Sequence, residues 1–388
     1  MEVAFFYIKD YDIFLIEEKL KKGIDLIGGY NSYFNKDEKI LLKPNLLSSD
    51  DPEKGVITHP IFFEAVVRYF KNQSADIKVG DSPAISSSLK VAKESGILEI
   101  CEKYNIDFIE FKEKVTIKGN TQNIVKSFEI SKEVLDFDKI VSLPKLKNHS
   151  LTIFTGGIKN LFGVIPGKTK ALMHTRFPNP QIFSKMIVDL ADSLKTGICI
   201  MDGIIAHEGE GPRGGNPIKL GYLIVGENPF IVDLLAVKLV GYDPKDIPFL
   251  FYYSQKHDVS LSLEDHQIYG DELIFSNNFK KINIDKIHFS SKILKNSFIY
   301  NKISSKPYFV REKCTMCLEC LNICPTKPKS ILLKERRANL IKGKIFKKSK
   351  YLKYNYNTCI RCFCCQEICP SKAIKIKDSI VGKILRKI

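Results

Sequence analysis

Residues 314–325 read Cys-Thr-Met-Cys-Leu-Glu-Cys-Leu-Asn-Ile-Cys-Pro, and residues 359–370 read Cys-Ile-Arg-Cys-Phe-Cys-Cys-Gln-Glu-Ile-Cys-Pro. Both stretches contain the spacing Cys-x2-Cys-x2-Cys-x3-Cys-Pro. Three thiols in each run lie on a tight loop, and the fourth, followed by proline, starts a separate turn. This spacing is typical of [4Fe–4S] ligands, and in its duplicated form the fourth cysteine of each run ligates the other cluster.

The duplicated spacing therefore predicts two [4Fe–4S] clusters with crossed ligands. One set is Cys314, Cys317, Cys320 and Cys369, and the other is Cys359, Cys362, Cys365 and Cys324. We disfavour disulfides, because the N-terminal residues show no export signal and a cytoplasmic location is expected. Zinc sites rarely use this spacing. Cys364 is left over, and we favour a packed side chain there over an alternative ligand. Residues 305–377 resemble the two-cluster ferredoxins of bacteria, which implies a small α+β domain.

Charge and cysteine divide the chain at the same place. The chain has 388 residues and a formal net charge of +16, but residues 301–388 carry +17 and residues 1–300 carry −1. Nine of the eleven cysteines also follow position 301. We therefore expect a core domain at 1–300, a cluster-binding domain at 305–377 and a tail at 378–388, with Ser304–Pro307 as a linker. The composition excludes a collagen-like or disordered chain, and no apolar stretch reaches the ~18–20 residues of a membrane span.

The basic C-terminal part suggests binding partners. The tail places apolar residues on one helical face and basic residues on the other, which predicts contact with an anionic membrane surface or a helix that caps the protein's own core. We favour the cap. The basic charge would also attract an acidic redox partner of the ferredoxin or flavodoxin type. Nucleic acid is disfavoured, although Tyr351, Tyr354 and Tyr356 lie among lysines.

Residues 1–300 alternate short apolar runs with amphipathic stretches, which predicts an α/β fold with a mostly parallel, doubly wound sheet. The expected strands are 4–8, 40–43, 77–80, 108–111, 139–143, 198–201 and 223–225. The expected helices include 61–70, 86–94, 180–194 and 230–240.

Polar residues follow several of these strands. Ligands of open α/β sheets bind at the carboxyl ends of the strands, so we expect one shared cleft. The candidates are Lys43, Asn45, Asp81, Lys145, Lys147, His149 and Asp202. The alternative is that polar residues only mark where strands stop.

Two glycine-containing loops are further candidates. Residues 155–163 include Gly156, Gly157, Lys159 and Asn160, and predict either an anion site at a helix start or a tight turn; His174 follows in the next loop. Residues 209–215 match G-x-G-x-x-G but do not open a helix after a strand, so we expect a substrate-gating loop or a plain turn.

Taken together, the motifs of residues 1–255 resemble the domain of unknown function 362 family of iron–sulfur proteins. The motifs are Lys43-Pro44-Asn45-Leu46, Thr58-His59-Pro60, Gly80-Asp81-Ser82-Pro83, Pro144-Lys145-Leu146-Lys147, residues 157–163, His174 and Asp202-Gly203-Ile204. Family members often carry an Asp-Pro-Val-Ala-Val-Asp-like stretch. Here residues 227–233 keep its final residue, Asp233, whereas its first position is not an aspartate. The resemblance implies the fold and the clusters, and leaves a flavin or a further metal open.

Three functions are weighed. The first, which we favour, is a ferredoxin-type oxidoreductase in which the clusters deliver electrons to a small anionic substrate in the cleft. Lys145, Lys147 and Lys159 would bind the anion, and His149, His174 or Asp81 would handle protons. The second is an electron-transfer module that docks a partner enzyme. The third is cofactor assembly or nucleic-acid handling.

Overall fold

The computed structural model describes residues 1–73, 75–83, 86–177, 179–282, 306–336 and 349–377. The expected tail at 378–388 and the first half of the expected linker lie outside them. The chain forms two compact units. The first unit is Met1–Lys170 with Pro180–Ile282, and the second is Ala171–Asn179 with the described residues after Ile282.

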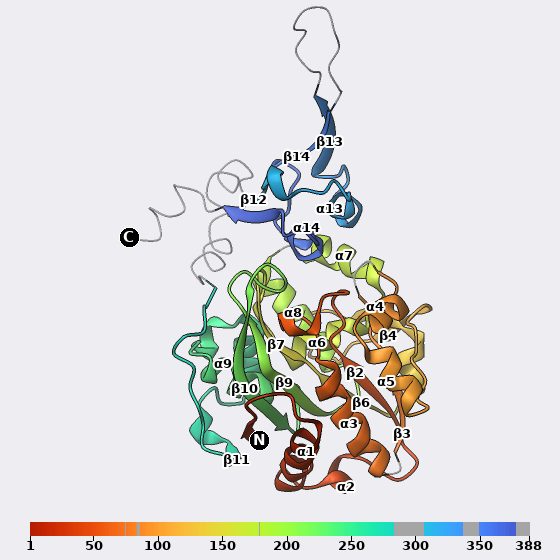
Figure 1. Ribbon diagram of the computed structural model, residues 1–388, viewed down its shortest axis with the longest axis vertical. Coiled ribbons are helices and arrows are strands. Elements are labelled where there is room, and N and C mark those ends of the chain that lie inside the picture. Colours follow the sequence, from red (N-terminus) through yellow and green to blue (C-terminus); the bar gives the residue numbers. More distant parts are fainter. Residues whose placement is uncertain (74, 84–85, 178, 283–305, 337–348, 378–388) are drawn as a thin grey trace, which may run out of the picture. The chain divides into compact units, whose positions relative to one another are not determined.

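Within the described residues, a nine-stranded sheet forms the centre of the first unit (Figure 1). Seven strands follow the order β11-β1-β10-β9-β6-β2-β3, β7 pairs with β9, and β8 pairs with β7. The pairs on the β6-β2-β3 side are parallel, whereas β10 is antiparallel to β1 and to β9. The strands are β1 (Glu2–Tyr7), β2 (Lys39–Pro44), β3 (Asp76–Val79), β6 (Lys139–Leu143), β7 (Lys145–His149), β8 (Ile153–Thr155), β9 (Thr196–Glu208), β10 (Asn216–Gly226) and β11 (Gln267–Gly270).

Helices cover both faces of this sheet. Because side chains alternate along a strand, Ile198 and Ile200 of β9 join the core beneath α1 and α3, whereas Cys199 points toward α6. The expected mostly parallel, doubly wound α/β fold is confirmed. The helices described between residues 1 and 282 are α1 (Ile13–Leu26), α2 (Tyr30–Tyr33), α3 (Pro60–Asn72), α4 (Ser88–Glu94), α5 (Ile97–Lys103), α6 (Gly157–Asn160), α7 (Gly167–Arg176), α8 (Pro180–Ala191), α9 (Pro229–Leu239) and α10 (Pro248–His257). Of these, α7 begins in the first unit and ends in the second.

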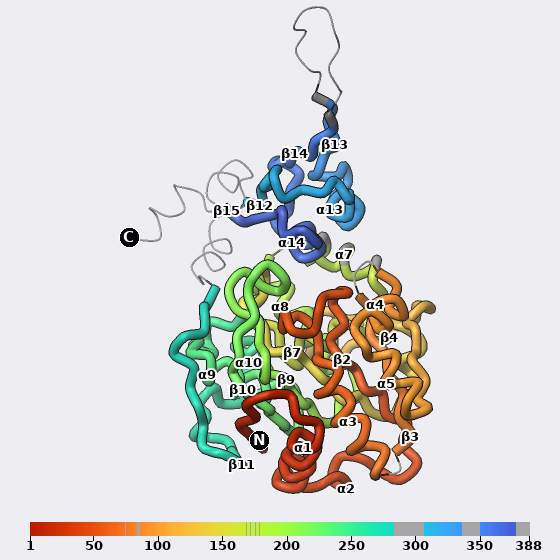
Figure 2. Tube along the Cα trace, viewed as in Figure 1, coloured from red at the N-terminus to blue at the C-terminus, as the bar shows by residue number. Residues whose placement is uncertain are grey.

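Local sequence fixes where several helices begin. Asp12 caps α1 by accepting hydrogen bonds from the backbone N–H groups of Phe14 and Leu15. Helices α3, α9 and α10 have proline in their first turn, where the missing N–H costs no intrahelical bond. Far along the chain, β11 returns to pair in parallel with β1, so residues 2–5 and 267–270 lie side by side (Figure 2).

Two expected elements differ from the structure. The strand expected at 198–201 is β9, which continues to Glu208 and forms a long hairpin with β10 (Figure 2). The loop at 209–215 is the connection of that hairpin, and its next element is a strand, not a helix. The stretch expected to be a strand at 108–111 forms only one isolated parallel bridge, between Phe108 and Val79. A separate two-stranded sheet joins β4 (Lys114–Lys118) to β5 (Ser127–Ser131).

Besides the end of α7, the described part of the second unit contains two small antiparallel sheets and two short helices. The strand β12 (Lys306–Phe309) pairs with β15 (Ile374–Lys377), and β13 (Ile331–Arg336) pairs with β14 (Ser349–Tyr354). The helices are α13 (Glu319–Ile323) and α14 (Cys364–Ile368). Lys306 and Pro307, expected in the linker, instead begin β12 because they pair with Lys377 and Ile376.

Candidate functional site

The two cysteine loops have the same unusual backbone. Met316 and Leu318 in the first loop have φ of 57° and 63°, and Arg361 and Phe363 in the second have φ of 61° and 60°. These are left-handed conformations that non-glycine residues rarely adopt and that collect at ligand-holding loops. The repeated pattern curls each loop so that its cysteines turn inward.

A first cavity lies inside the first loop. Four of its lining residues are Cys314, Cys317, Cys320 and Cys369, and it encloses about 280 Å³ of empty space, part of it open to solvent. Cys369 comes from the end of the other run. The remaining walls are mainly apolar, with Phe309, Leu318, Leu352, Ala373 and Ile374 among them.

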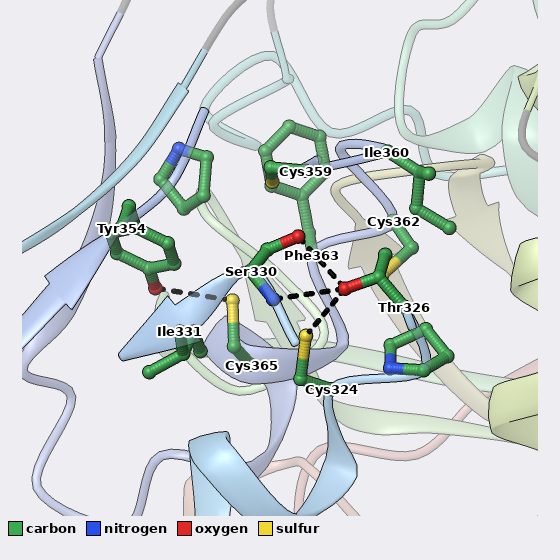
Figure 3. Close-up of a pocket in the computed structure, with 12 residues that line it drawn as sticks. Cys324, Thr326, Ser330, Ile331, Tyr354, Cys359, Ile360, Cys362, Phe363 and Cys365 are labelled. Carbon is green, nitrogen blue, oxygen red and sulfur yellow. Dashed lines mark hydrogen bonds between the residues drawn. The ribbon is translucent and has the colours of Figure 1, made fainter. Parts of the chain in front are cut away.

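A second cavity lies inside the second loop (Figure 3). Its cysteines are Cys324, Cys359, Cys362 and Cys365, and it encloses about 320 Å³, again partly open to solvent. Two hydroxyls contact its sulfurs: Tyr354 Oη donates to Cys365 Sγ at 3.2 Å, and Thr326 Oγ1 lies 3.4 Å from Cys324 Sγ. Burial raises the pKa of Tyr354 well above its ordinary value, so the hydroxyl stays protonated.

The residues present fit [4Fe–4S] clusters. Such a cluster is held by four cysteine thiolates bound to different irons, so its ligands must surround a hollow instead of meeting at one point. Each cavity has four cysteines around a hollow, and each set of four is the one that the crossed spacing assigns. Among the described residues, no three His, Cys, Asp or Glu side chains are gathered around a single-ion position.

Cys364 differs from its neighbours. It is buried on α14, and the lining of the two cavities does not include it. Its Sγ lies 4.0 Å from the carbonyl oxygen of Cys362. This position agrees with a packed side chain.

In the first unit, a buried ion pair joins the ends of β2 and β3. Lys43 Nζ donates to Asp81 Oδ1 at 2.6 Å, and the backbone N–H of Leu46 donates to Asp81 Oδ2 at 2.8 Å. Burial alone would raise the pKa of Asp81, but Lys43 and Lys170 hold it below its usual range. Gly163 packs directly on the pair, since a Cβ there would lie 2.1 Å from Asp81 Oδ1 and 2.2 Å from Lys43 Nζ.

A second buried ion pair lies between β7 and β9. Lys145 Nζ donates to Asp202 Oδ2 at 2.8 Å, and both side chains are fully buried. Tyr11 Oη donates to Asp202 Oδ1 at 2.8 Å, and the backbone N–H of His59 donates to Oδ2 at 2.9 Å. The rings of Tyr11 and His59 stack with centroids 3.6 Å apart. Burial lowers the pKa of His59, and its Nδ1 accepts from the N–H of Ile61, so we assign a neutral ring.

Two amide side chains link the ion pairs. Asn160 Oδ1 accepts from Asn45 Nδ2 at 3.0 Å and lies 3.4 Å from Lys43 Nζ, while Asn45 Oδ1 accepts from Lys147 Nζ at 2.7 Å. Through Thr58, whose Oγ1 accepts from the Asn45 N–H, the chain of contacts reaches the neighbouring His59. We call this set the polar network: Tyr11, Lys43, Asn45, Thr58, His59, Asp81, Lys145, Lys147, Asn160, Lys170 and Asp202.

Lys170 adds a second ammonium group near Asp81. Its Nζ donates to the carbonyl oxygen of Ser82, next to Asp81 in the chain. Burial lowers the pKa of Lys170 from 10.5 to about 7; Asp81 acts against this shift, and Lys43 and Lys159 add to it. This lysine is therefore able to give up or take up a proton near neutral pH.

In the glycine loop at 155–163, the first N–H groups of α6 bind a carboxyl group from another part of the same chain. Asp233 of α9 accepts from the N–H of Gly157 at 2.5 Å and from the N–H of Ile158 at 3.0 Å. Gly156 leaves room for it, since a Cβ there would lie 1.9 Å from Asp233 Oδ1. The hydrogen-bond acceptor at the first N–H groups of α6 is thus a carboxyl group of the protein itself.

Three other predicted site residues are not part of the polar network. His149 ends β7, where its Nδ1 accepts from the N–H groups of Leu151 and Thr152 and closes a turn. Lys159 is partly exposed on α6 and acts on Lys170 through its charge. His174 is buried on α7, within Ala171–Asn179 of the second unit.

Sequence reasoning did not single out Tyr11 and Lys170. Tyr11 follows β1, and no short motif predicts the antiparallel pairing of β1 with β10. Lys170 lies on α7, in a stretch that the sequence predicts to be a loop. The signal for Lys170 would have been the excess of lysine over acid at 159–170.

Comparisons with known proteins agree with this anatomy. The family model described as domain of unknown function (DUF362) matches residues 40–238, and the model described as 4Fe-4S dicluster domain matches residues 306–370. A thylakoid-associated protein of Synechocystis sp. is 33% identical over 242 residues, which cover 62% of this chain and 74% of that protein. The described helices include none with the length and apolar character to cross a bilayer. The C-terminal domain is thus an iron–sulfur domain that serves electron transfer, and the chain belongs to the DUF362 family.

Proposed function

We propose that each cavity holds one [4Fe–4S] cluster, so that the chain carries two. The first is held by Cys314, Cys317, Cys320 and Cys369, and the second by Cys324, Cys359, Cys362 and Cys365. Four inward-facing thiols around each hollow support this assignment. When bound, a [4Fe–4S] cluster takes up and releases one electron at a time.

The electrons, in this proposal, reduce a small anionic substrate at the polar network of the first unit. The observation that carries it is the charge around Asp81. Two buried ammonium groups, those of Lys43 and Lys170, act on the one carboxyl group of Asp81. Lys43 and Asp81 are buried, and buried charge is costly unless it is compensated. A bound phosphate, sulfate or carboxylate group would compensate the excess of ammonium groups.

The same residues supply what a reduction needs. A two-electron reduction of one substrate bond consumes one electron from each reduced cluster and two protons. Lys170 Nζ, with its pKa of about 7, is suited to deliver a proton at the anion, and solvent would then reprotonate it. An external one-electron donor protein of the ferredoxin or flavodoxin type would restore the electrons.

The test is reoxidation of the reduced holoprotein. The anaerobic protein is reduced with dithionite, freed of excess reductant, and mixed with single small anions while the cluster absorbance is followed. One anion class should reoxidise both clusters, and Lys170→Met should abolish this response without changing the iron content. Lys132→Met is the matched control, because Lys132 lies in an exposed ion pair with Glu113. Identical rates in all three proteins would contradict a reaction at the network.

A second candidate is an electron-transfer module that docks a partner enzyme and performs no chemistry itself. It is favoured by the internal pairing of Lys43 with Asp81 and of Lys145 with Asp202, which gives both ion pairs a structural role. Exposed Lys334, Lys350 and Lys353 on β13 and β14 would attract an acidic partner. This candidate predicts reoxidation by a redox protein, weakened by salt, and none by small anions.

Contact with a membrane surface is a further part of the proposal. The relative from Synechocystis is named for its association with thylakoids. The basic amphipathic pattern at 378–388 suits an anionic lipid surface without a spanning helix. Sedimentation with anionic vesicles, lost on deletion of 378–388, would test it.

A further inference from the structure

The two cysteine loops align residue by residue, because their cysteine spacing is the same and positive φ angles occur at equivalent positions. Met316 therefore corresponds to Arg361, and Glu319 corresponds to Cys364. The first loop carries an acidic side chain between its cysteines, and the second carries a basic one. Two sites with the same ligands thus differ in the charge built beside them.

Arg361 is held close to the second cavity. Its side chain is buried, with 4% of the residue exposed, and Nη1 donates to the carbonyl oxygen of Cys359 at 2.7 Å. It also donates to the carbonyl oxygen of Tyr356 and lies over that ring, 5.2 Å from the centroid. A guanidinium group remains protonated at any relevant pH, so this is a fixed positive charge against a ligand of the second cavity. Lys306, 5.2 Å from the same ring, adds a second cation.

Tyr354 adds a hydrogen bond to the same site. Its hydroxyl donates to Cys365 Sγ at 3.2 Å, as Figure 3 shows. The ring is fixed by stacking on Phe309, with centroids 4.5 Å apart, and on Tyr356, with centroids 5.7 Å apart. Hydrogen bonds to cluster sulfurs and nearby positive charge both stabilise the reduced, more negative state and raise the reduction potential.

Other contacts act in the opposite direction. At the first cavity, the N–H of Ala373 donates to Cys369 Sγ at 3.2 Å, and Cys317 is exposed to solvent. The position equivalent to Ala373 is Pro328, which has no N–H to donate. Glu367 on α14 places a negative charge near Cys362. Against these stand two cations, one of them buried, and a charge in a low-dielectric site outweighs a single N–H dipole.

We propose that the second cavity, through Arg361 and Tyr354, holds the cluster of higher reduction potential. The first electron from an external one-electron donor then resides there, taking that cluster from the 2+ to the 1+ state with no proton or bond change. The second electron goes to the first cavity at lower potential. This inference rests on the proposal that each cavity holds one cluster.

The test is a redox titration of the anaerobic holoprotein followed by electron paramagnetic resonance. Arg361→Met should lower the higher midpoint potential by about 59 mV. At a fixed potential, this shift lowers the ratio of reduced to oxidised cluster about tenfold for a one-electron couple. Tyr354→Phe should lower the same midpoint by less. Met316→Arg should raise the lower midpoint, and the double exchange should bring the two together or invert them. In Cys320→Ser, the midpoint that remains should be the one that responds to Arg361→Met.

The outcomes separate the two proposals. Fewer than two clusters in the wild-type chain would overturn the proposed cofactor content. If two clusters are present and neither Arg361→Met nor Tyr354→Phe changes the higher midpoint potential, the proposed cofactor content holds and this inference is overturned. A higher midpoint that survives in Cys365→Ser and not in Cys320→Ser would also overturn it. Thr315→Val, in the first loop and without a change of charge, is the control for loop disturbance.

Discussion

Met316 and Arg361 occupy equivalent positions in the two cysteine loops, and both have left-handed backbone conformations, with φ of 57° and 61°. The shared conformation curls each loop around its cavity. The two side chains then differ in charge, which is one of the properties that set the reduction potential of a cluster from outside its ligand set. One duplicated motif thus provides two sites of similar shape and different electrostatics.

The cysteine assignment predicts the cluster content of single variants. Cys320→Ser should leave the second cluster intact. If the first cluster is removed, iron and acid-labile sulfide should fall by about half; if it is converted to a three-iron cluster, iron should fall by about one atom in eight. Cys365→Ser should do the same through the second cavity, and Cys364→Ser should leave the content unchanged because that side chain is packed on α14. Iron and sulfide analysis of the anaerobic proteins checks this. An unchanged content in Cys320→Ser would show that the crossed sets are wrong.

The Lys145–Asp202 pair predicts a large stability effect. Lys145→Met leaves the Asp202 carboxylate buried without its counter-charge, which should lower the free energy of unfolding by about 3–5 kcal/mol. The double variant Lys145→Met, Asp202→Asn should recover part of the loss, since no uncompensated charge remains. Chemical unfolding followed by circular dichroism measures both. Lys219→Met, at an exposed ion pair with Asp10, is the control and should change little.

Asp233 predicts a pH dependence of stability. Burial raises its pKa from 3.8 to about 7, so the folded protein binds this proton more tightly than the unfolded chain. Its contribution to the free energy of unfolding should therefore fall as pH rises from about 4 to about 7, by up to about 1.4 kcal/mol per pH unit, and then level off. Asp233→Asn should lack this component. Equal slopes in the two proteins between about pH 5.5 and about pH 7 would contradict the assignment.

Lys170 predicts a pH dependence of anion binding. Sulfate keeps its charge near neutral pH, whereas Lys170, with a pKa of about 7, loses its proton. Sulfate affinity should therefore fall as pH rises, approaching about tenfold per unit above pH 7. Isothermal titration calorimetry should show weak, pH-independent binding in Lys170→Met and the wild-type profile in Lys132→Met. The same profile in wild type and Lys170→Met would exclude Lys170 from the site.

Much of this organisation could be read from the sequence because it is local. The spacing of Cys314–Cys324 and Cys359–Cys369 states which thiols share a loop, and the cavities contain the same sets. The strand ends at Lys43 and Asp81 were placed together by the topology of parallel sheets, and the structure joins them at 2.6 Å.

The rest depends on contacts between distant segments. Tyr11 reaches Asp202 across 191 positions, and Asp233 caps α6 from a different helix. The strand β9 extends to Glu208 because it pairs with β10 and β7. Asp202 therefore lies in the middle of a strand, whereas the local sequence predicted that the strand ends at residue 201. Lys170 depends on tertiary burial, which changes its chemistry without changing its local pattern.

Native mass spectrometry of the anaerobically purified chain tests the central claim most directly. We expect a mass that equals the chain plus two clusters, or about eight iron atoms, and an additional mass for a small anion that is either bound on purification or binds when it is added. That added mass should be absent in Lys170→Met and present in Lys132→Met. Two clusters and no anion under any condition would contradict a reaction at the polar network and would favour a module that serves a partner enzyme.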